Sequence, residues 1–196
     1  MASLITPTGI LSFPVLFTPR PVVQGGDPRY GINLIIDPTG QKTPEFAALR
    51  RAVAQIIDEK WGTGKSRDKA FVGKLRNPFL SCADVDYEGY EDKDAVFIRP
   101  WSKNKPGLID AYRNEITVPG DIWAGQLVRC SVNPFAYEQS GNRGVSFGLN
   151  NVQVCRVDGR RLDGRRAAKD EFGDYDDGNA GQRQMADEDI PFFATF

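Results

Sequence analysis

Aromatic and basic side chains alternate along several short apolar segments of this 196-residue chain. Trp101 has the same strand parity as Arg99, and Phe135 and Tyr137 have the parity of Arg129. Flat rings can stack on nucleotide bases while cations neutralise the neighbouring phosphates. We therefore predict contacts to single-stranded nucleic acid from Arg20, Arg29, Tyr30, Arg99, Trp101, Lys103, Lys105, Tyr112, Arg113, Arg129, Phe135, Tyr137 and Arg143.

The residues for nucleophilic or zinc-dependent catalysis are missing from the sequence. The chain has no histidine, so a Ser-His-Asp or Cys-His arrangement cannot be built. Cys82, Cys130 and Cys155 are widely separated and form no C-x-x-C pair, which excludes a Cys/His zinc site. We expect no cofactor and no resident metal.

One acidic segment leaves a catalytic alternative open. Asp84, Asp86, Asp92 and Asp94 are carboxylates of the kind that bind divalent metals in nucleases. They lack the glycine and the terminal glutamate of an EF-hand loop, and a solvated turn is the simpler interpretation. A metal-dependent nuclease is therefore the alternative to a non-catalytic binding protein.

Charge is distributed unevenly along the chain. Residues 167–196 hold two basic and eight acidic side chains, a net charge of −6, whereas residues 1–166 hold 23 basic and 18 acidic side chains, a net charge of +5. A basic body suits a polyanion, and an acidic tail could imitate one. A tail that only adds solubility explains the same numbers, so charge alone leaves both interpretations open.

The elements that must position these residues are mostly strands. Alternation over 11–18 predicts a first strand with one apolar face, made of Leu11, Phe13, Val15 and Phe17, and Pro14 marks an edge strand or a bulge. The apolar positions of the last strand change parity at Asn150-Asn151, which indicates another β-bulge.

A single helix interrupts the strands. Thr43 is its predicted N-cap, Pro44 its first residue and Gly62 its end, with an apolar stripe of helical spacing between them. A mainly β chain with one α-helix and a bulged strand favours a Greek-key barrel of the OB type. We predict this OB domain over residues 1–158, followed by a flexible acidic tail over 159–196.

The C-terminal segment carries the most specific motif. Its residues Asp187, Glu188, Asp189, Ile190, Pro191 and Phe192 resemble the acidic tip of bacterial and bacteriophage single-stranded DNA-binding proteins, a run of acids followed by Ile-Pro-Phe. The body is similar to the phage single-stranded DNA-binding family of the short-tail replication type. That similarity is carried by residues 99–103, Tyr112, 123–125, Val128-Arg129, 134–137 and 144–153.

The resemblance implies an OB fold and a non-catalytic protein that coats single-stranded DNA in phage replication, recombination and repair. It implies that the tail tip recruits replication and recombination proteins, and that the protein acts in the host cytoplasm. No apolar run is long enough for a membrane span. An RNA-binding OB protein remains a further alternative, and the choice between monomer and homodimer stays open.

Overall fold

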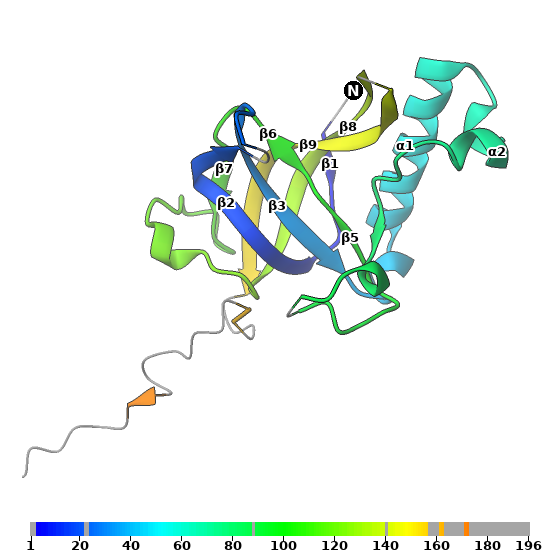
Figure 1. Cartoon of the computed structure of the whole chain (residues 1–196). Helices are drawn as coiled ribbons and strands as arrows, with labels where there is room; N and C mark the ends of the chain where they lie inside the picture. Colours follow the sequence, from blue (N-terminus) through cyan, green and yellow to red (C-terminus); the bar gives the residue numbers. More distant parts are fainter. Residues whose placement is uncertain are drawn as a thin grey trace, which may run out of the picture. The chain divides into compact units, whose positions relative to one another are not determined.

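Paired strands form a closed ring in this computed structural model (Figure 1). The ring consists of β2 (Gly9–Pro21), β3 (Pro28–Ile36), the broken strand β5 (Val96–Ile98) and β6 (Trp101–Ser102), β9 (Asn142–Arg156) and β8 (Leu127–Gln139). Each pairs with the next, β6 with β9 in parallel, and β8 returns to β2. The mainly β class is thereby confirmed, while the OB assignment itself stays a prediction.

Shorter elements complete the described part of the chain. They are β1 (Leu4–Ile5), β4 (Leu80–Ser81), β7 (Gly107–Ile109), helices α1 (Pro44–Trp61) and α2 (Lys69–Val72), and the 3-10 turns η1 (Gly40–Lys42), η2 (Lys65–Arg67), η3 (Cys82–Asp84) and η4 (Pro119–Asp121). The prediction of one α-helix is therefore incomplete, because α2 follows α1 after a short connection.

The structure describes residues 3–21, 24–87, 89–139, 141–156, 161–162 and 171–172. The chain divides into two units, Met1–Gly164 and Arg165–Phe196. The predicted tail tip, 187–192, lies outside the described residues, and the predicted domain boundary at 158 stays a prediction. No helix among the described residues is long and apolar enough to cross a membrane.

Helix α1 begins and ends as the sequence predicts. The Thr43 hydroxyl accepts a hydrogen bond from the Phe46 amide at 3.3 Å, and Pro44 occupies the first turn. Gly62 ends the helix with φ of +112°, a conformation that favours glycine. The apolar stripe buries Phe46, Leu49, Val53 and Ile57 against the barrel.

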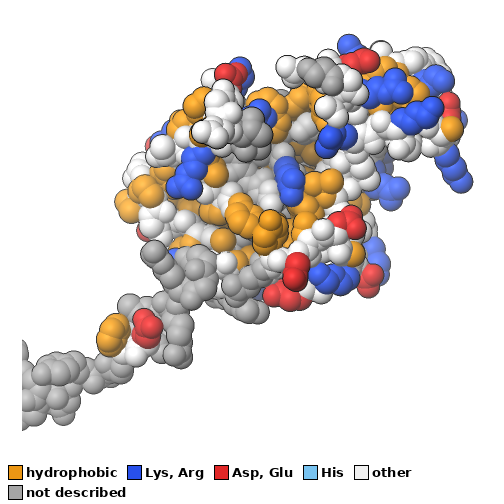
Figure 2. All heavy atoms as spheres, in the orientation of Figure 1, with side chains coloured by type: hydrophobic (Ala, Val, Ile, Leu, Met, Phe, Trp, Pro, Cys, Tyr) orange, Lys and Arg blue, Asp and Glu red, His pale blue; other side chains and the backbone are white. Residues whose placement is uncertain are grey.

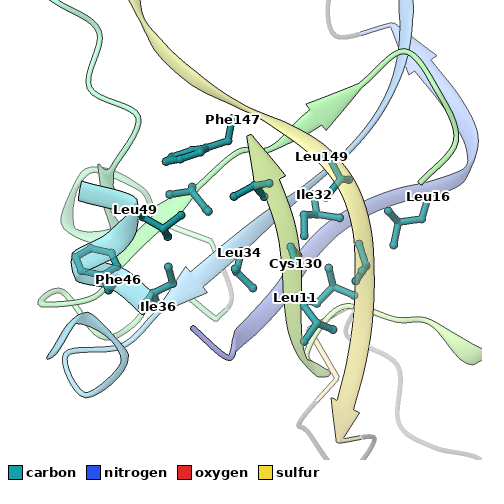
Figure 3. Packing of buried hydrophobic residues seen from close by; sticks show 14 of the residues in the cluster. Leu11, Leu16, Ile32, Leu34, Ile36, Phe46, Leu49, Cys130, Phe147 and Leu149 are labelled. Carbon is teal, nitrogen blue, oxygen red and sulfur yellow. The ribbon is translucent and has the colours of Figure 1, made fainter. Parts of the chain in front are cut away.

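The core fills the barrel and continues under α1 (Figure 3). Leu11, Leu34 and Val128 are fully buried inside the ring. At the helix, the rings of Phe46 and Phe79 lie 5.2 Å apart, and Phe79 lies 5.7 Å from Phe147. This chain of aromatic contacts joins α1 to β9 through the segment that precedes β4.

Two β-bulges decide which side chains point inward. The register of β8 and β9 shifts between Ser131 and Val132, where Asn150 is the extra residue, so the bulge predicted there is confirmed. The register of β2 shifts near Pro14, which confirms the predicted bulge in the first strand. The predicted alternation fails at this bulge: Phe13 has φ of +46° and an exposed ring, while Leu16, of opposite parity, is buried.

Candidate nucleic-acid interface

Trp101 lies at the centre of an aromatic and basic cluster on the outside of the barrel. The Arg29 guanidinium lies over its ring, 4.3 Å from the centroid, and the Phe135 ring meets it edge-on at 5.7 Å. The three side chains come from β3, β6 and β8. Strand β9 lies between β6 and β8, and it has Gly148 opposite Trp101. Trp101 is half-buried, so its ring is held by neighbours and still partly accessible.

A glycine on β3 makes room for this tryptophan. Gly31 is the register partner of Trp101. A Cβ atom at Gly31 would lie 3.1 Å from the Pro100 carbonyl oxygen and 3.4 Å from the Trp101 Cβ. Arg29 therefore reaches the indole ring across a position that carries no side chain.

The predicted lysines flank this cluster with their own partners. Lys103 forms an exposed ion pair with Asp27 at 2.6 Å, and its hydrogen bond and charge hold the pKa of the Asp27 carboxyl below its usual value. Exposed pairs contribute little stability, so a phosphate can compete for Lys103. The Lys105 ammonium lies 5.6 Å from the centroid of the Phe17 ring. The predicted aromatic residue Tyr30 lies on β3 next to this cluster, as the register partner of Ser102 on β6.

A concave pocket of about 300 Å³ adjoins the cluster. Its lining includes Arg76, Arg99, Tyr137 and Ser146. Ser146 is also the register partner of Phe135, which ties the pocket to the Trp101 cluster. Arg99 lies over the Phe97 ring, 5.0 Å from its centroid. The pocket is therefore lined by two arginines and by the aromatic residue Tyr137.

Sequence reasoning missed Arg76, which reaches this pocket through a close backbone contact. Its amide donates to the Arg143 carbonyl at 2.9 Å, and its guanidinium donates to Asn142 Oδ1. Both partners belong to β9, more than 60 residues further along the chain. Its basic side chain is the only local signal for Arg76, since the pairing itself is long-range.

We expect Gly144→Ala to destabilise this contact, because a Cβ atom at Gly144 would lie 2.6 Å from the Arg76 carbonyl oxygen. Crowding of this kind costs about 1–3 kcal/mol of unfolding free energy. Urea denaturation measures the change. Gly120→Ala is the matched control, because a Cβ there meets nothing within 4 Å. Equal stability of the two variants would contradict the close approach.

Other predicted contacts lie apart from the Trp101 cluster. Arg129 donates to Gln153 Oε1 at 2.8 Å and lines separate pockets with Ile5. The register partner of Ile109 is Gln153, five residues along β9 from Gly148, which is a separation of about 16 Å. Tyr112 and Arg113, which follow Ile109, are exposed at that end.

Two predicted residues remain: Arg20 lies near the Trp101 cluster, and Arg143 lies beyond the pocket. Arg20 is the register partner of Arg29, at the outer end of the first hairpin. Arg143 follows the tip of the β8–β9 hairpin, and its guanidinium lies 5.1 Å from the Phe71 ring centroid.

Another aromatic pair was not predicted as a site. The rings of Phe13 and Tyr87 meet edge-on at 5.4 Å and are 53% and 58% exposed. The bulge at Phe13 turns its ring outward, which is why the alternation of β2 wrongly assigned this ring to the apolar face. Rare backbone conformations of this kind at bulky residues are often found at functional sites.

The acidic residues of the nuclease alternative lie in turns and loops and make local contacts there. The Asp92 carboxylate accepts the Asp94 amide at 3.0 Å, and the Asp94 carbonyl accepts from Gln41. Asp84 closes η3, and Asp86 follows it in the loop. Among the residues that the structure describes, no three His, Cys, Asp or Glu side chains are grouped so that they could hold a metal ion.

A small barrel whose outer face holds aromatic rings beside cations is typical of one class, the single-stranded nucleic-acid-binding proteins. The family model described as Enterobacter phage Enc34, ssDNA-binding protein, matches residues 2–182. The chain therefore belongs to this phage single-stranded DNA-binding protein family.

Solved structures share the fold. The chain is similar to the single-stranded DNA-binding protein from bacteriophage Enc34, with 18% identity, a TM-score of 0.63, and coverage of 85% of this chain and 87% of that one. The structure of that protein in complex with ssDNA matches with 19% identity, a TM-score of 0.60, and coverage of 81% and 88%.

A second phage protein has a related structure. Gp2.5, a single-stranded DNA-binding protein encoded by bacteriophage T7, matches with 13% identity, a TM-score of 0.55, and coverage of 85% of this chain and 98% of that one. A search among curated proteins found no match.

Proposed function

We propose that this chain is a non-catalytic protein that binds single-stranded DNA, with the Trp101 cluster at the centre of its binding face. The observation that carries the proposal is the half-buried indole ring in contact with Arg29 and Phe135 on the outside of the barrel. A ring fixed in this way loses little conformational freedom when a base stacks on it. Arg29 lies close enough to neutralise the adjoining phosphate.

The family supports this proposal, and it favours DNA coating over the nuclease alternative. Strand-borne rings and cations read no particular base edge, because every base offers a face for stacking. We therefore expect sequence-tolerant binding, as DNA replication, recombination and repair in the host cytoplasm would require.

The acidic C-terminal residues complete the proposed function. Their net charge of −6 is opposite to the +5 of residues 1–166. We propose that the tip, Asp187 to Phe192, binds replication and recombination proteins. The pocket that receives the tip belongs to the partner protein and is basic at its rim and apolar at its floor. Ile190→Ala with Phe192→Ala tests this role, because it keeps every acid and removes the apolar anchors.

Salt dependence provides the direct test of DNA binding. We expect the logarithm of the affinity for oligothymidine to fall linearly with the logarithm of salt concentration, with a slope of about −0.7 for each phosphate neutralised. Fluorescence anisotropy of a labelled oligomer measures this slope. An affinity that does not change with salt would count against the proposal.

Two control reactions separate the alternatives. Labelled oligothymidine incubated with Mg²⁺ should remain intact, and cleavage that EDTA abolishes would favour the nuclease. Competition with a matched RNA oligomer separates DNA from RNA binding, because only RNA offers the 2′-hydroxyl. Preference for the RNA competitor would favour an RNA-binding protein.

A further inference from the structure

The positive charge of the body is concentrated in one short segment. Residues 60–76 hold six basic side chains and one acidic side chain, a net charge of +5, which equals the net charge of all residues 1–166. The rest of the body is therefore neutral overall. The segment runs from the end of α1 through η2 and α2, where Figure 2 shows blue side chains gathered at the upper right.

The aromatic ring of Phe71 lies close to two cations, one from this segment and one from β9. The Lys65 ammonium lies 5.2 Å and the Arg143 guanidinium 5.1 Å from the Phe71 centroid. Trp61 meets the same ring edge-on at 5.9 Å. Attraction between cations and a ring of this kind positions the charges without neutralising them.

Acidic side chains in this region are already engaged by the protein. The Asp58 carboxylate accepts the Ser66 amide at 2.7 Å and its hydroxyl at 3.0 Å, which fixes the turn before α2. Asp68 caps α2 by accepting the Phe71 amide and also pairs with Lys65 at 3.3 Å. Glu138 accepts from the Trp61 indole at 3.4 Å.

This basic surface reaches the Trp101 cluster around the edge of β9, through Arg76. Arg143 is the register partner of Glu138, three residues beyond Phe135 on β8 and about 10 Å further along the hairpin. Both side chains point toward α1 and α2, on the face of the hairpin opposite to Phe135. Arg76 belongs to both regions, because it lines the pocket beside Arg99 and donates its amide to the Arg143 carbonyl. Cations and rings thus continue from the barrel to α2.

We propose that residues 60–76 together with Arg143, the helical basic surface, form a second phosphate-binding site that receives single-stranded DNA leaving the Trp101 cluster. The inference rests on the proposed function and extends it, because it assigns the DNA a path off the barrel and onto the α1–α2 segment. The footprint is then longer than the barrel face, and an oligomer too short to span both sites gains nothing from the second.

Oligomer length tests this path. We compare oligothymidines of about 4 and about 16 nucleotides, the limits of the usual site size for one OB fold. The variant Lys65→Gln/Arg143→Gln removes two cations from the helical basic surface. Lys42→Gln/Lys93→Gln removes the same charge elsewhere, from η1 before α1 and from the acidic loop before β5.

We expect the long oligomer to lose about 1.4 units of salt slope in the first variant, since each cation contributes about 0.7. Its affinity at low salt should fall several-fold, while the short oligomer binds as it does to the wild type. The control should leave both slopes near the wild-type values. Normal binding of the short oligomer also shows that the variant barrel is folded.

Two results would overturn the inference alone. The long oligomer could keep its full slope in the Lys65/Arg143 variant, which would mean that these cations touch no phosphate. Both oligomers could lose slope equally, which would make the cations part of the barrel site. Failure of the wild-type protein to bind either length would instead overturn the proposed function.

Discussion

Trp101→Ala is expected to weaken binding of single-stranded DNA by about 1–3 kcal/mol, the usual contribution of one stacked base. This corresponds to a loss of affinity of about 5- to 150-fold. The ring lies against Arg29 and Phe135 on the outer face, so its removal takes away a stacking surface and releases the guanidinium above it. Anisotropy titration with labelled oligothymidine measures the loss.

Two further variants locate the centre of the binding face. Trp101→Phe keeps an aromatic ring and should lose less affinity than Trp101→Ala. Tyr112→Ala removes an 85% exposed ring at the distant end of β9 and should lose little. If Tyr112→Ala costs as much as Trp101→Ala, the face is not centred on Trp101. A large fall in melting temperature for Trp101→Ala would show a role in folding instead.

Of the substitutions proposed for this protein, Phe147→Ala should cause the largest loss of stability, about 3–5 kcal/mol of unfolding free energy. Phe147 is 1% exposed, and its ring meets Phe79, which in turn meets Phe46 of α1. Truncation therefore leaves a cavity where the helix joins the barrel. Urea denaturation followed by circular dichroism measures the change.

A matched phenylalanine on the other face provides the control. Phe135 is half-buried on β8, so Phe135→Ala should destabilise the fold much less than Phe147→Ala. Phe147→Leu, which fills most of the same space, should also lose less. Equal losses for Phe135→Ala and Phe147→Ala would contradict the assignment of Phe147 to the core and Phe135 to the outside.

Local signals explain why α1 and the β8–β9 hairpin were predictable. The cap at Thr43 and the proline at position 44 act on the first turn of α1, and Gly62 acts on the last, so each signal lies within a few residues of the helix end that it determines. The parity change at Asn150 likewise shows in the sequence itself, because the side chains before and after it alternate cleanly. The inward face of β2 could not be predicted this way, since the Phe13 bulge moves Leu16 into the core.

The candidate site was predictable in residue type and only partly in position. Trp101 and Phe135 were both expected to contact nucleic acid, but their contact depends on strand pairings between distant segments. Arg129 has the parity of Phe135 and still lies elsewhere, because parity does not distinguish the two ends of a long strand. Arg76 reaches the pocket only because Gly144 allows a close backbone approach.

Closure of the ring by its last strands also determines when the protein can finish folding. Gly9 of β2 pairs with Val128 of β8, about 120 residues later, and the Thr6 amide donates to the Cys130 carbonyl. At about 5–20 residues per second, translation leaves the free edge of β2 exposed for roughly 6–24 s. An unpaired edge is a template for another chain, so aggregation during synthesis is most probable in this interval.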